Sequence, residues 1–393
     1  MRQAARTFDD AEILSEFWTT IARSQKSGWD KLLPGQITAE LRRRSYDSSI
    51  LAKTKSKPGR EFARLISEKL KISKFSEHET GRFSYDAVAQ HFDRQVARRL
   101  RQGGVDAIYA YEDSALQSFR SAEQNGIKCI YELPIGHWRL ARRVFTEEAE
   151  LHPEWAPTLE GLRDSDAKLA RKDEEVRLAE KIVVPSQFVA DSLLECPNVR
   201  AEVSIVNYGC PDPVGCVNRF SDGPLRVLFV GSLGARKGLH YLLEAVKGLD
   251  VELTLVGPRP HTSCEALDEG TRKHRYLGSI PRERVLEEMA RNEVFVFPTL
   301  FEGLANVLLE SLSQGLVPIT TANSGAVGVI EDGKDGFIVP LRNVEAIREK
   351  LHLLQSDRER LYEMRLAAVQ KATERSWARY REQLLAVVRG GFD

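Results

Sequence analysis

The second half of the sequence alternates between short apolar runs and segments with helical periodicity. Residues 226–231 (RVLFVG) and 251–257 (VELTLVG) have the length and character of buried strands, and apolar residues at 239, 242, 243 and 246 lie on one helix face between them. The same alternation continues through residues 275–280, 282–292, 294–298, 317–321 and 336–341. Strands that alternate with helices in this way predict a parallel sheet covered by helices.

The first half shows the same alternation from about residue 85, where apolar residues at helical spacing precede a strand-like run at 105–112. Ser186 is placed to cap a helix after another such run. The charged stretch 163–181 is typical of a solvated helix. The first 80 residues show no convincing opening strand and no glycine-rich turn after one. The further strand-like runs are 127–134, 181–186 and 203–209.

A stretch rich in glycine and proline, residues 209–224, separates the two regular halves and predicts a linker. A chain of 393 residues is too long for one ordinary core and about right for two domains. We therefore predict an α/β chain of two domains, residues 1–208 and 209–375, whose parallel sheets face each other across a cleft.

The composition is that of a globular protein, with 42% hydrophobic and 29% charged residues. No stretch approaches the roughly 20 apolar residues that a membrane span needs. Asp9, Asp10 and Glu12 stand where an export signal would have its apolar core, so we expect a cytoplasmic protein. Five scattered cysteines without a CxxC pair argue against a disulfide framework and a zinc site.

Positive charge is concentrated near the N-terminus. The formal net charge of the chain is zero, but residues 1–101 contain 21 Lys and Arg against 13 Asp and Glu. One interpretation is peripheral contact with an anionic membrane, at its inner face, or with a phosphorylated acceptor. The other is a solvated face, or two lobes of opposite charge. The basic runs are 42–44 (RRR), 53–57 (KTKSK) and Arg98, Arg99 and Arg101. We expect no nucleic-acid partner.

Residues 301–315 (FEGLANVLLESLSQG) contain two glutamates, Glu302 and Glu310. A helical wheel puts Leu304, Ala305, Leu308 and Leu312 on one face and Asn306, Glu310, Ser313 and Gln314 on the other. Periodicity alone therefore predicts a solvated Glu310, and a Glu302 that favours the positive end of the helix dipole.

The position of this helix suggests a second interpretation, because it follows the apolar strand 294–298 and so begins at the carboxyl edge of the sheet. Gly303 lets the backbone approach a ligand, and the N–H groups of Leu304, Ala305 and Asn306 can receive a phosphate. Glu310, two turns further along, could accept hydrogen bonds from the paired hydroxyls of a ribose.

A second glycine-rich segment, residues 231–238 (GSLGARKG), follows the strand at 226–230 and precedes a helix. It lacks the ending of a P-loop and the G-x-G-x-x-G dinucleotide fingerprint. It brings Arg236 and Lys237 to the same edge as Gly303, where two cations suit a diphosphate. Two solvated residues at a helix start are the alternative.

Residues 294–321 (VFVFPTLFEGLANVLLESLSQGLVPITT) resemble the signature of the retaining nucleotide-sugar glycosyltransferases of the GT-B fold, often called family 4, group 1 type. That family has two glutamates with seven residues between them, the spacing of Glu302 and Glu310. Residues 226–246 resemble its diphosphate-binding segment and residues 181–195 its approach to the linker. The resemblance implies two Rossmann-like domains, with a closing helix at 376–393 that completes the N-terminal, acceptor-side domain.

By position, the resemblance implies that Glu310 binds the ribose, Glu302 the donor sugar, and Arg236 with Lys237 the diphosphate. Donor contacts are also implied for Gly231, Ser232, Gly303, Leu304, Ala305 and Asn306. His137 falls where the family often has a histidine beside the donor sugar, although a packing role is as plausible. Ser232 stands where many members have a further arginine, and the glycine-rich turn of the first lobe is not visible.

The resemblance implies transfer of a sugar from a nucleoside diphosphate to a hydroxyl of a saccharide, a lipid-linked compound or another acceptor, in polysaccharide, glycolipid or other glycoconjugate assembly. We expect no metal or other cofactor, because fixed cations face the leaving diphosphate and the only DxD, Asp164 to Asp166, lies in the charged stretch and not at a strand end. A sugar-nucleotide epimerase of the same fold and a degenerate nucleotide-sugar-binding scaffold protein are the alternatives.

Overall fold

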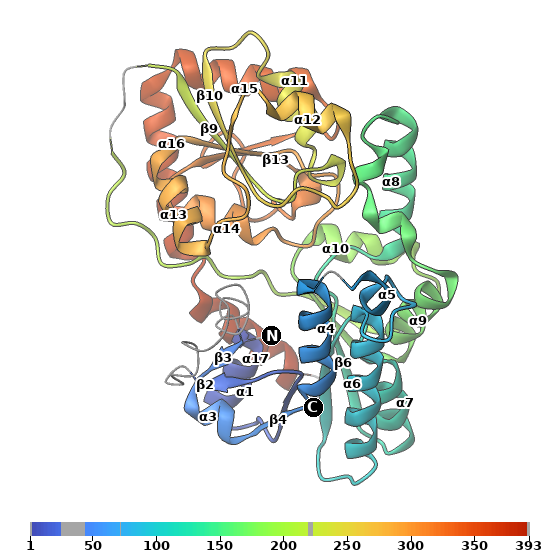
Figure 1. Ribbon diagram of the computed structural model, residues 1–393. Helices are drawn as coiled ribbons and strands as arrows, with labels where there is room; N and C mark the ends of the chain where they lie inside the picture. The colour runs from blue at the N-terminus through green and yellow to red at the C-terminus, as the bar shows by residue number, and fades with distance from the viewer. Residues whose placement is uncertain (1, 25–43, 71, 219–222, 391–393) are drawn as a thin grey trace.

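The computed structural model describes residues 2–24, 44–70, 72–218 and 223–390. Two parallel sheets lie in separate halves of the molecule, the C-terminal one at the top of Figure 1. The C-terminal sheet has the strand order β11-β10-β9-β12-β13-β14, as the alternation predicts. Its strands are β9 (Leu225–Val230), β10 (Val251–Val256), β11 (Arg275–Tyr276), β12 (Val294–Phe297), β13 (Val317–Thr321) and β14 (Phe337–Val339).

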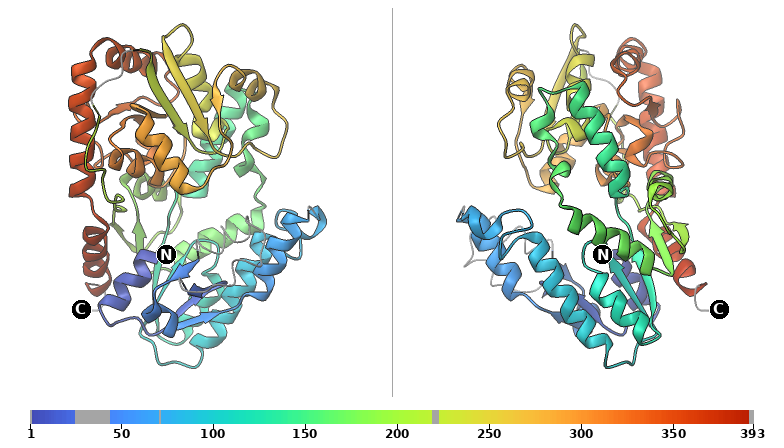
Figure 2. Two further views of the ribbon diagram at one scale, coloured as in Figure 1. Left: turned by 60° about the vertical axis from the view of Figure 1, so that its left-hand side comes forward. Right: turned by 90° about the vertical axis from the view of Figure 1, so that its right-hand side faces the viewer.

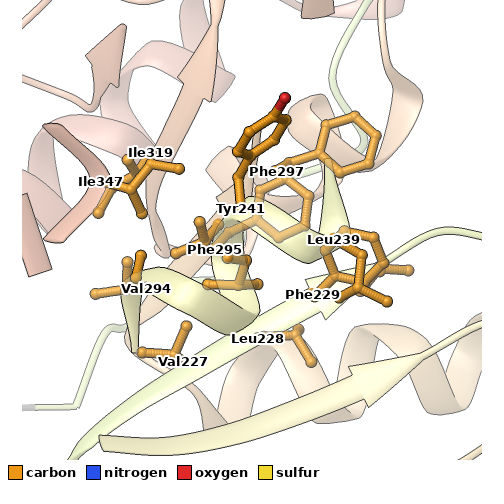
Figure 3. Packing of buried hydrophobic residues seen from close by; sticks show 14 of the residues in the cluster. Val227, Leu228, Phe229, Leu239, Tyr241, Val294, Phe295, Phe297, Ile319 and Ile347 are labelled. Carbon is orange, nitrogen blue, oxygen red and sulfur yellow. The ribbon is translucent and has the colours of Figure 1, made fainter. Parts of the chain in front are cut away.

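The central strands of this sheet are buried on both faces, which explains their continuous apolar sequence. Val227, Leu228 and Phe229 of β9 are fully buried and lie beside β12 and α11 in Figure 3. Each such side chain contributes about 1.5 to 3 kcal/mol of burial free energy. The helices of this half are α11 (Leu239–Ala245), α12 (Glu265–Thr271), α13 (Arg282–Arg291), α14 (Asn306–Ser313), α15 (Val344–Ser356) and α16 (Arg358–Glu374).

The N-terminal sheet has four parallel strands in the order β5-β6-β7-β8. The helix expected from about residue 85 is confirmed as α6 (Tyr85–Leu100). Ser186 caps its helix as predicted, because its Oγ accepts a hydrogen bond from the Val189 N–H. The remaining elements here are β5 (Ala107–Tyr111), β6 (Lys128–Glu132), β7 (Lys181–Val184), β8 (Glu202–Ile205), α7 (Leu116–Gln124) and α10 (Gln187–Ser192).

The described strands of the first 80 residues are two or three residues long and pair only with one another. The pairs are β1 (Phe17–Thr19) with β4 (Thr54–Ser56) and β2 (Arg23–Ser24) with β3 (Ser45–Tyr46). Strands this short leave no readable apolar period. The helices are α1 (Arg2–Asp10), α3 (Ser48–Ala52), α4 (Gly59–Lys69) and α5 (Ser73–Ser76). Of the basic run at 42–44, Arg42 and Arg43 lie outside the described residues.

The last helix returns to the N-terminal half of the molecule. In α17 (Trp377–Arg389), the side chains of Tyr380, Leu384 and Val388 pack in one cluster with residues of α1, β6 and β7. Figure 1 shows α17 beside α1. This is where the resemblance puts the closing helix, while the exact domain boundaries stay a prediction.

One helix from the first half of the sequence packs against the C-terminal sheet. Val144 and Phe145 of α8 (Trp138–Leu151) belong to the core cluster of that sheet. Glu148 of the same helix is fully buried and accepts hydrogen bonds from His240 (2.6 Å), Tyr241 (2.8 Å) and Arg342 (2.7 Å). Loss of one of these partners would leave a buried charge poorly paired, so the contact ties α8 to the C-terminal half at this point.

The helix expected to be solvated at 163–181 is largely packed, so that prediction is wrong for α9 (Asp166–Leu178). Glu175 is 0% exposed and accepts from the N–H groups of Asp113, Ala115 and Leu116 and from the Tyr131 hydroxyl. Burial raises the pKa of Glu175 to about 7, against these hydrogen bonds. Charged residues can be buried in a helix when each charge has a partner. Such a helix is packed although its sequence has the low hydropathy of a solvated one.

The two acids of the DxD also differ from one another. The Asp166 side chain is exposed, whereas Asp164 precedes the helix and binds His78 and Lys168. Neither acid lies at the end of a strand, and the Asp164 side chain is 19% exposed.

A main-chain contact joins the loop after β6 to the loop after β12. Ile135 and Gly303 form an antiparallel bridge, and the Gly136 N–H donates to the Glu302 carbonyl over 3.1 Å. The Ser186 hydroxyl donates to the Gly303 carbonyl over 2.6 Å. We call these residues the interdomain seam. It fixes the position of Glu302 relative to the N-terminal half.

Among the described residues, no helix has both the length and the apolar character needed to cross a bilayer. The five cysteines are free thiols, four of them buried and Cys216 exposed.

The seam leaves no room for a side chain at Gly303, because a Cβ there would lie 1.8 Å from the Pro134 carbonyl oxygen. We expect Gly303→Ala to destabilise the protein by about 3 kcal/mol, the upper range of overpacking, and to lower the Tm by several degrees. Gly215→Ala is the control, since nothing lies within 4 Å of its added methyl group. Equal Tm values for both variants by calorimetry would contradict this account of the seam.

Candidate active site

The carboxyl ends of β9 and β12 lie side by side where the strand order of the C-terminal sheet reverses. From β9 the chain continues to β10 and β11 on one side of the sheet. From β12, which pairs with β9 on its other side, it continues to β13 and β14 in the opposite direction. Ligands of open α/β sheets bind in the crevice at such a switch point. The segments 231–238 and 301–315 follow these two strands, so they share one edge of the sheet, as predicted.

The segment after β9 is held on the loop after β12. Leu300 N–H and the Thr299 hydroxyl both donate to the Arg236 carbonyl, over 2.9 and 3.0 Å. Gly238 has φ of 68°, and a Cβ there would lie 1.9 Å from the Pro298 carbonyl oxygen, so only glycine fits. The turn thereby directs Arg236 and Lys237 to the edge, while Gly231 directly follows β9 and Ser232 is exposed.

Glu302 lies between the two predicted cations. Its Oε1 contacts Lys237 Nζ directly, Arg236 Nη1 at 3.4 Å and the Thr299 hydroxyl at 3.3 Å. The side chains of Glu302 and Lys237 are 12% and 11% exposed. The structure therefore brings Glu302, implied to bind the donor sugar, together with Arg236 and Lys237, implied to bind the diphosphate, in a partly buried ion cluster.

Burial lowers the pKa of Lys237 to about 8, although the Glu302 carboxylate opposes the shift and Arg236 adds to it. A partly dehydrated ammonium group binds an anion more strongly than a solvated one, because less water screens the attraction. The site therefore holds positive charge that is only partly balanced by one carboxylate.

The start of α14 differs from the phosphate-binding helix start that the sequence predicts. Ala305 is the N-cap residue without a side-chain cap, and Asn306 opens the helix. The Ala305 N–H, however, already donates to the Ser324 carbonyl over 3.0 Å. Leu304 and Ala305 are buried, and the space beside Gly303 is taken by the Pro134 carbonyl of the seam. Gly303 is thus required because the Pro134 carbonyl of the same chain approaches it closely, and not because a ligand does.

Glu310 faces a cavity and not open solvent. Its Oε1 accepts from Arg282 Nε over 2.6 Å, and the carboxylate side chain is 12% exposed. The helical wheel is wrong for Ser313, which is fully buried; its hydroxyl donates to the Glu310 carbonyl, and its own carbonyl accepts from the Val214 N–H of the linker. The cavity has a volume of about 470 Å³ and also contacts Asn306 and Leu309.

The opposite wall of this cavity comes from the N-terminal half and the linker. Glu132, at the end of β6, is 2% exposed and accepts from the hydroxyls of Tyr109 (2.6 Å) and Tyr208 (3.2 Å). The buried Tyr111 hydroxyl has no hydrogen-bond partner. Aromatic rings around a paired carboxylate form a wall that can donate and accept hydrogen bonds.

His137 makes a contact separate from the Lys237–Glu302 ion pair. Its ring is 1% exposed, with Nε2 at 3.3 Å from Asp173 Oδ1, and it packs on Trp138. Burial lowers the pKa of His137 to about 4, against the effect of Asp173. The seam brings the main chain of Gly136 to Glu302, but the imidazole is directed to α9. Its predicted role beside a donor sugar stays a prediction.

Three groups of described side chains could offer ligand atoms to a metal ion. Within two of them, Asp173 already binds Trp138 and Arg139, and Glu148 binds Arg342. Among the described residues, none of these groups includes Glu302 or Glu310. The groups are His137, Asp173 and Cys196; Glu148, His152 and His240; and His78, Glu79 and Asp164.

The sequence analysis missed Arg282, which pairs with Glu310, and the wall around Glu132. Arg282 follows the strand-like run 275–280, so its place at a carboxyl edge could have been found. Glu132 ends an apolar run in the same way. The seam has no such signal, because its acceptors are main-chain carbonyls and its donors are the Gly136 N–H and the Ser186 hydroxyl, which the sequence predicts only as a helix cap.

Residues 217–375 match the family model described as glycosyl transferases group 1. The sucrose synthase of Acidithiobacillus caldus is 34% identical over 125 residues, which are 29% of this chain and 16% of that protein. The capsular polysaccharide biosynthesis glycosyltransferase CapM of Staphylococcus aureus is 30% identical over 33% of this chain and 36% of its own length. The matched region thus spans well under half of these curated relatives.

Solved structures extend the similarity to the whole fold. The sucrose-phosphate synthase of Thermosynechococcus elongatus has a TM-score of 0.63 at 17% identity, over 80% of this chain and 82% of that one. HepE of Anabaena, in complex with UDP, has a TM-score of 0.60 at 14% identity, over 95% and 100%. Residues 217–375 are therefore a group 1 glycosyltransferase domain, in a chain with the GT-B fold.

Proposed function

We propose that this protein is a glycosyltransferase that moves a sugar from a nucleoside diphosphate to an acceptor hydroxyl, with retention at the anomeric carbon. The observation that carries the proposal is the juxtaposition of Lys237, Arg236 and Glu302 at the switch point, on the loop that leads into the helix whose Glu310 lines a cavity. The domain match and the UDP complex of HepE support it. CapM supports polysaccharide or other glycoconjugate assembly as the setting.

Within this proposal, the diphosphate binds Lys237 and Arg236. The bond between the anomeric carbon and the diphosphate oxygen breaks, and negative charge grows on the departing phosphate. Fixed cations lower the energy of this transition state, because they are in place before the charge develops. The acceptor oxygen forms its bond on the same face of the sugar, and its proton passes to the leaving phosphate oxygen.

Glu302 changes partners in this scheme. Without donor, its carboxylate neutralises Lys237 and Arg236. A diphosphate competes for the same cations, so Glu302 becomes available to the hydroxyls of the donor sugar. In the same way, ribose hydroxyls compete with Arg282 for Glu310. In this scheme each binding group lies in an ion pair that the ligand replaces.

The two glutamates should give different binding defects. Glu310→Ala removes hydrogen bonds to a charged group, and we expect it to weaken nucleoside diphosphate binding by about 1.5 to 3 kcal/mol, roughly 10- to 100-fold. Glu302→Ala should leave that affinity nearly unchanged or raise it, since it removes the competing carboxylate, while lowering turnover.

Calorimetric titration and single-turnover rates measure both effects. Glu345→Ala, an exposed acid in the first turn of α15, is the control for a general charge or dipole effect of at most about 1 kcal/mol. Equal behaviour of the Glu302 and Glu310 variants would refute the assignment of separate roles.

The binding of nucleoside diphosphate should fall as the pH rises above about 8. Lys237 binds the diphosphate as an ammonium, and its pKa near 8 means that the neutral amine predominates at higher pH. Phosphate is already ionised there, since its second pKa is about 6. We expect a loss of up to roughly tenfold per pH unit, and a flat profile for Lys237→Arg, because arginine stays charged. A wild-type affinity that is constant from pH 7 to about 10 would disprove this role.

We also propose that transfer needs no divalent metal, since two cationic side chains already face the diphosphate. Activity should persist in EDTA without added ions. Loss of activity that magnesium or manganese restores would show that a metal supplies part of this charge.

A further inference from the structure

Helix α4 (Gly59–Lys69) is packed with its polar side inward. Glu61 is 5% exposed and accepts hydrogen bonds from Arg44 and Arg64, each 2.7 Å long. Burial raises the pKa of Glu61, but these hydrogen bonds outweigh it and leave the pKa lowered. Ser67 on the same side is 6% exposed. A helix of a globular protein ordinarily turns its apolar side to the core, so this orientation requires another explanation.

The apolar side of α4 faces outward. Phe62, Ile66 and Leu70 recur every four residues and therefore share one face; they are 37%, 49% and 62% exposed. Ile72 and Phe75, in the segment that follows α4, are 40% and 42% exposed. Of the thirteen exposed large apolar side chains among the described residues, these five fall within fourteen residues of sequence. Such a concentration marks an interaction surface, unlike single exposed side chains.

Basic side chains flank this row. Residues 53–82 contain nine Lys and Arg against four Glu and no Asp. Lys55 and Lys57 are exposed just before α4, and Lys74 and Arg82 are exposed beyond its C-terminal end. Figure 2 shows residues 59–76 projecting from the N-terminal half in both views. The surface is thus a protruding apolar ridge between cations.

From this combination we infer that the ridge formed by Phe62, Ile66, Leu70, Ile72 and Phe75 docks on an anionic lipid bilayer. A helix with an apolar face and flanking lysines lies in the plane of the interface, with its apolar side among the acyl chains. The lysines reach the headgroups, each worth about a fivefold gain in binding beside an anionic surface. The charge complementarity favours lipid over a protein partner with an apolar groove.

This inference goes beyond the proposed function, and it does not depend on it. It assigns membrane contact to one defined surface and not to the general charge excess of residues 1–101. Binding through the apolar part of this surface is insensitive to salt, whereas the attraction of its cations is screened within about 8 Å at physiological ionic strength.

Co-sedimentation of the full chain with vesicles tests the inference. Wild type should bind phosphatidylcholine vesicles that contain phosphatidylglycerol, and bind vesicles of phosphatidylcholine alone at least tenfold more weakly. The double variant Ile66→Ser with Leu70→Ser should bind the anionic vesicles at least tenfold more weakly than wild type. Lys55→Gln with Lys74→Gln should weaken binding by roughly 25-fold.

Two exposed residues outside the ridge serve as matched controls. Leu194→Ser removes a leucine that is 86% exposed, and Lys247→Gln removes a lysine of the C-terminal half that is 67% exposed. Both should bind as wild type does. Unchanged thermal melting of all variants shows that each is folded.

Three results would overturn the inference: no binding of wild type to anionic vesicles, equal binding to neutral and anionic vesicles, or equal binding of the Ile66 and Leu70 variant and wild type. A concentration-dependent dimer in sedimentation velocity that this variant abolishes, without vesicle binding, would assign the ridge to a second copy of the chain instead.

Discussion

The site depends on the interdomain seam, because the main-chain carbonyls of Glu302 and Gly303 are held by groups of the other half of the molecule. Gly136 binds the Glu302 carbonyl and Ser186 binds the Gly303 carbonyl. The contact leaves no room for any side chain at Gly303. Since the loop after β12 also binds the Arg236 carbonyl, the seam fixes the glutamate and both cations together. A change in the angle between the two halves would therefore reach the switch point directly.

Two ion pairs determine the arrangement of side chains at the site. Lys237 and Arg236 share one carboxylate oxygen of Glu302, and Arg282 pairs with Glu310 across the edge of the cavity. Both pairs are partly buried, where an unpaired charge would be costly. A ligand that carries a diphosphate at one end and hydroxyls at the other can replace both pairs without leaving a charge exposed to a low dielectric. A ligand with only the diphosphate or only the hydroxyls would replace one pair and leave the other intact, so the complete ligand is expected to be preferred.

Much of this arrangement could be predicted from local pattern. The apolar runs at 226–231 and 294–298 predicted adjacent strand ends, and the topology bears this out. Prediction was wrong where tertiary packing overrides periodicity: Glu175 is buried because main-chain N–H groups pair with it, and Ser313 is buried with its hydroxyl bound to the Glu310 carbonyl. The orientation of α4 could not be predicted, since its apolar period would ordinarily put Phe62 and Ile66 in the core. The seam could not be predicted because its hydrogen bonds to main-chain carbonyls leave no periodic trace in sequence.

A crystal structure of the protein with a bound nucleoside diphosphate tests the central claim most directly. The account predicts diphosphate oxygens within hydrogen-bond distance of Lys237 and Arg236, with Glu302 displaced from Lys237. It also predicts ribose hydroxyls on Glu310 in place of Arg282. A nucleotide bound elsewhere, or one that leaves the Lys237–Glu302 and Arg282–Glu310 pairs intact, would contradict the account.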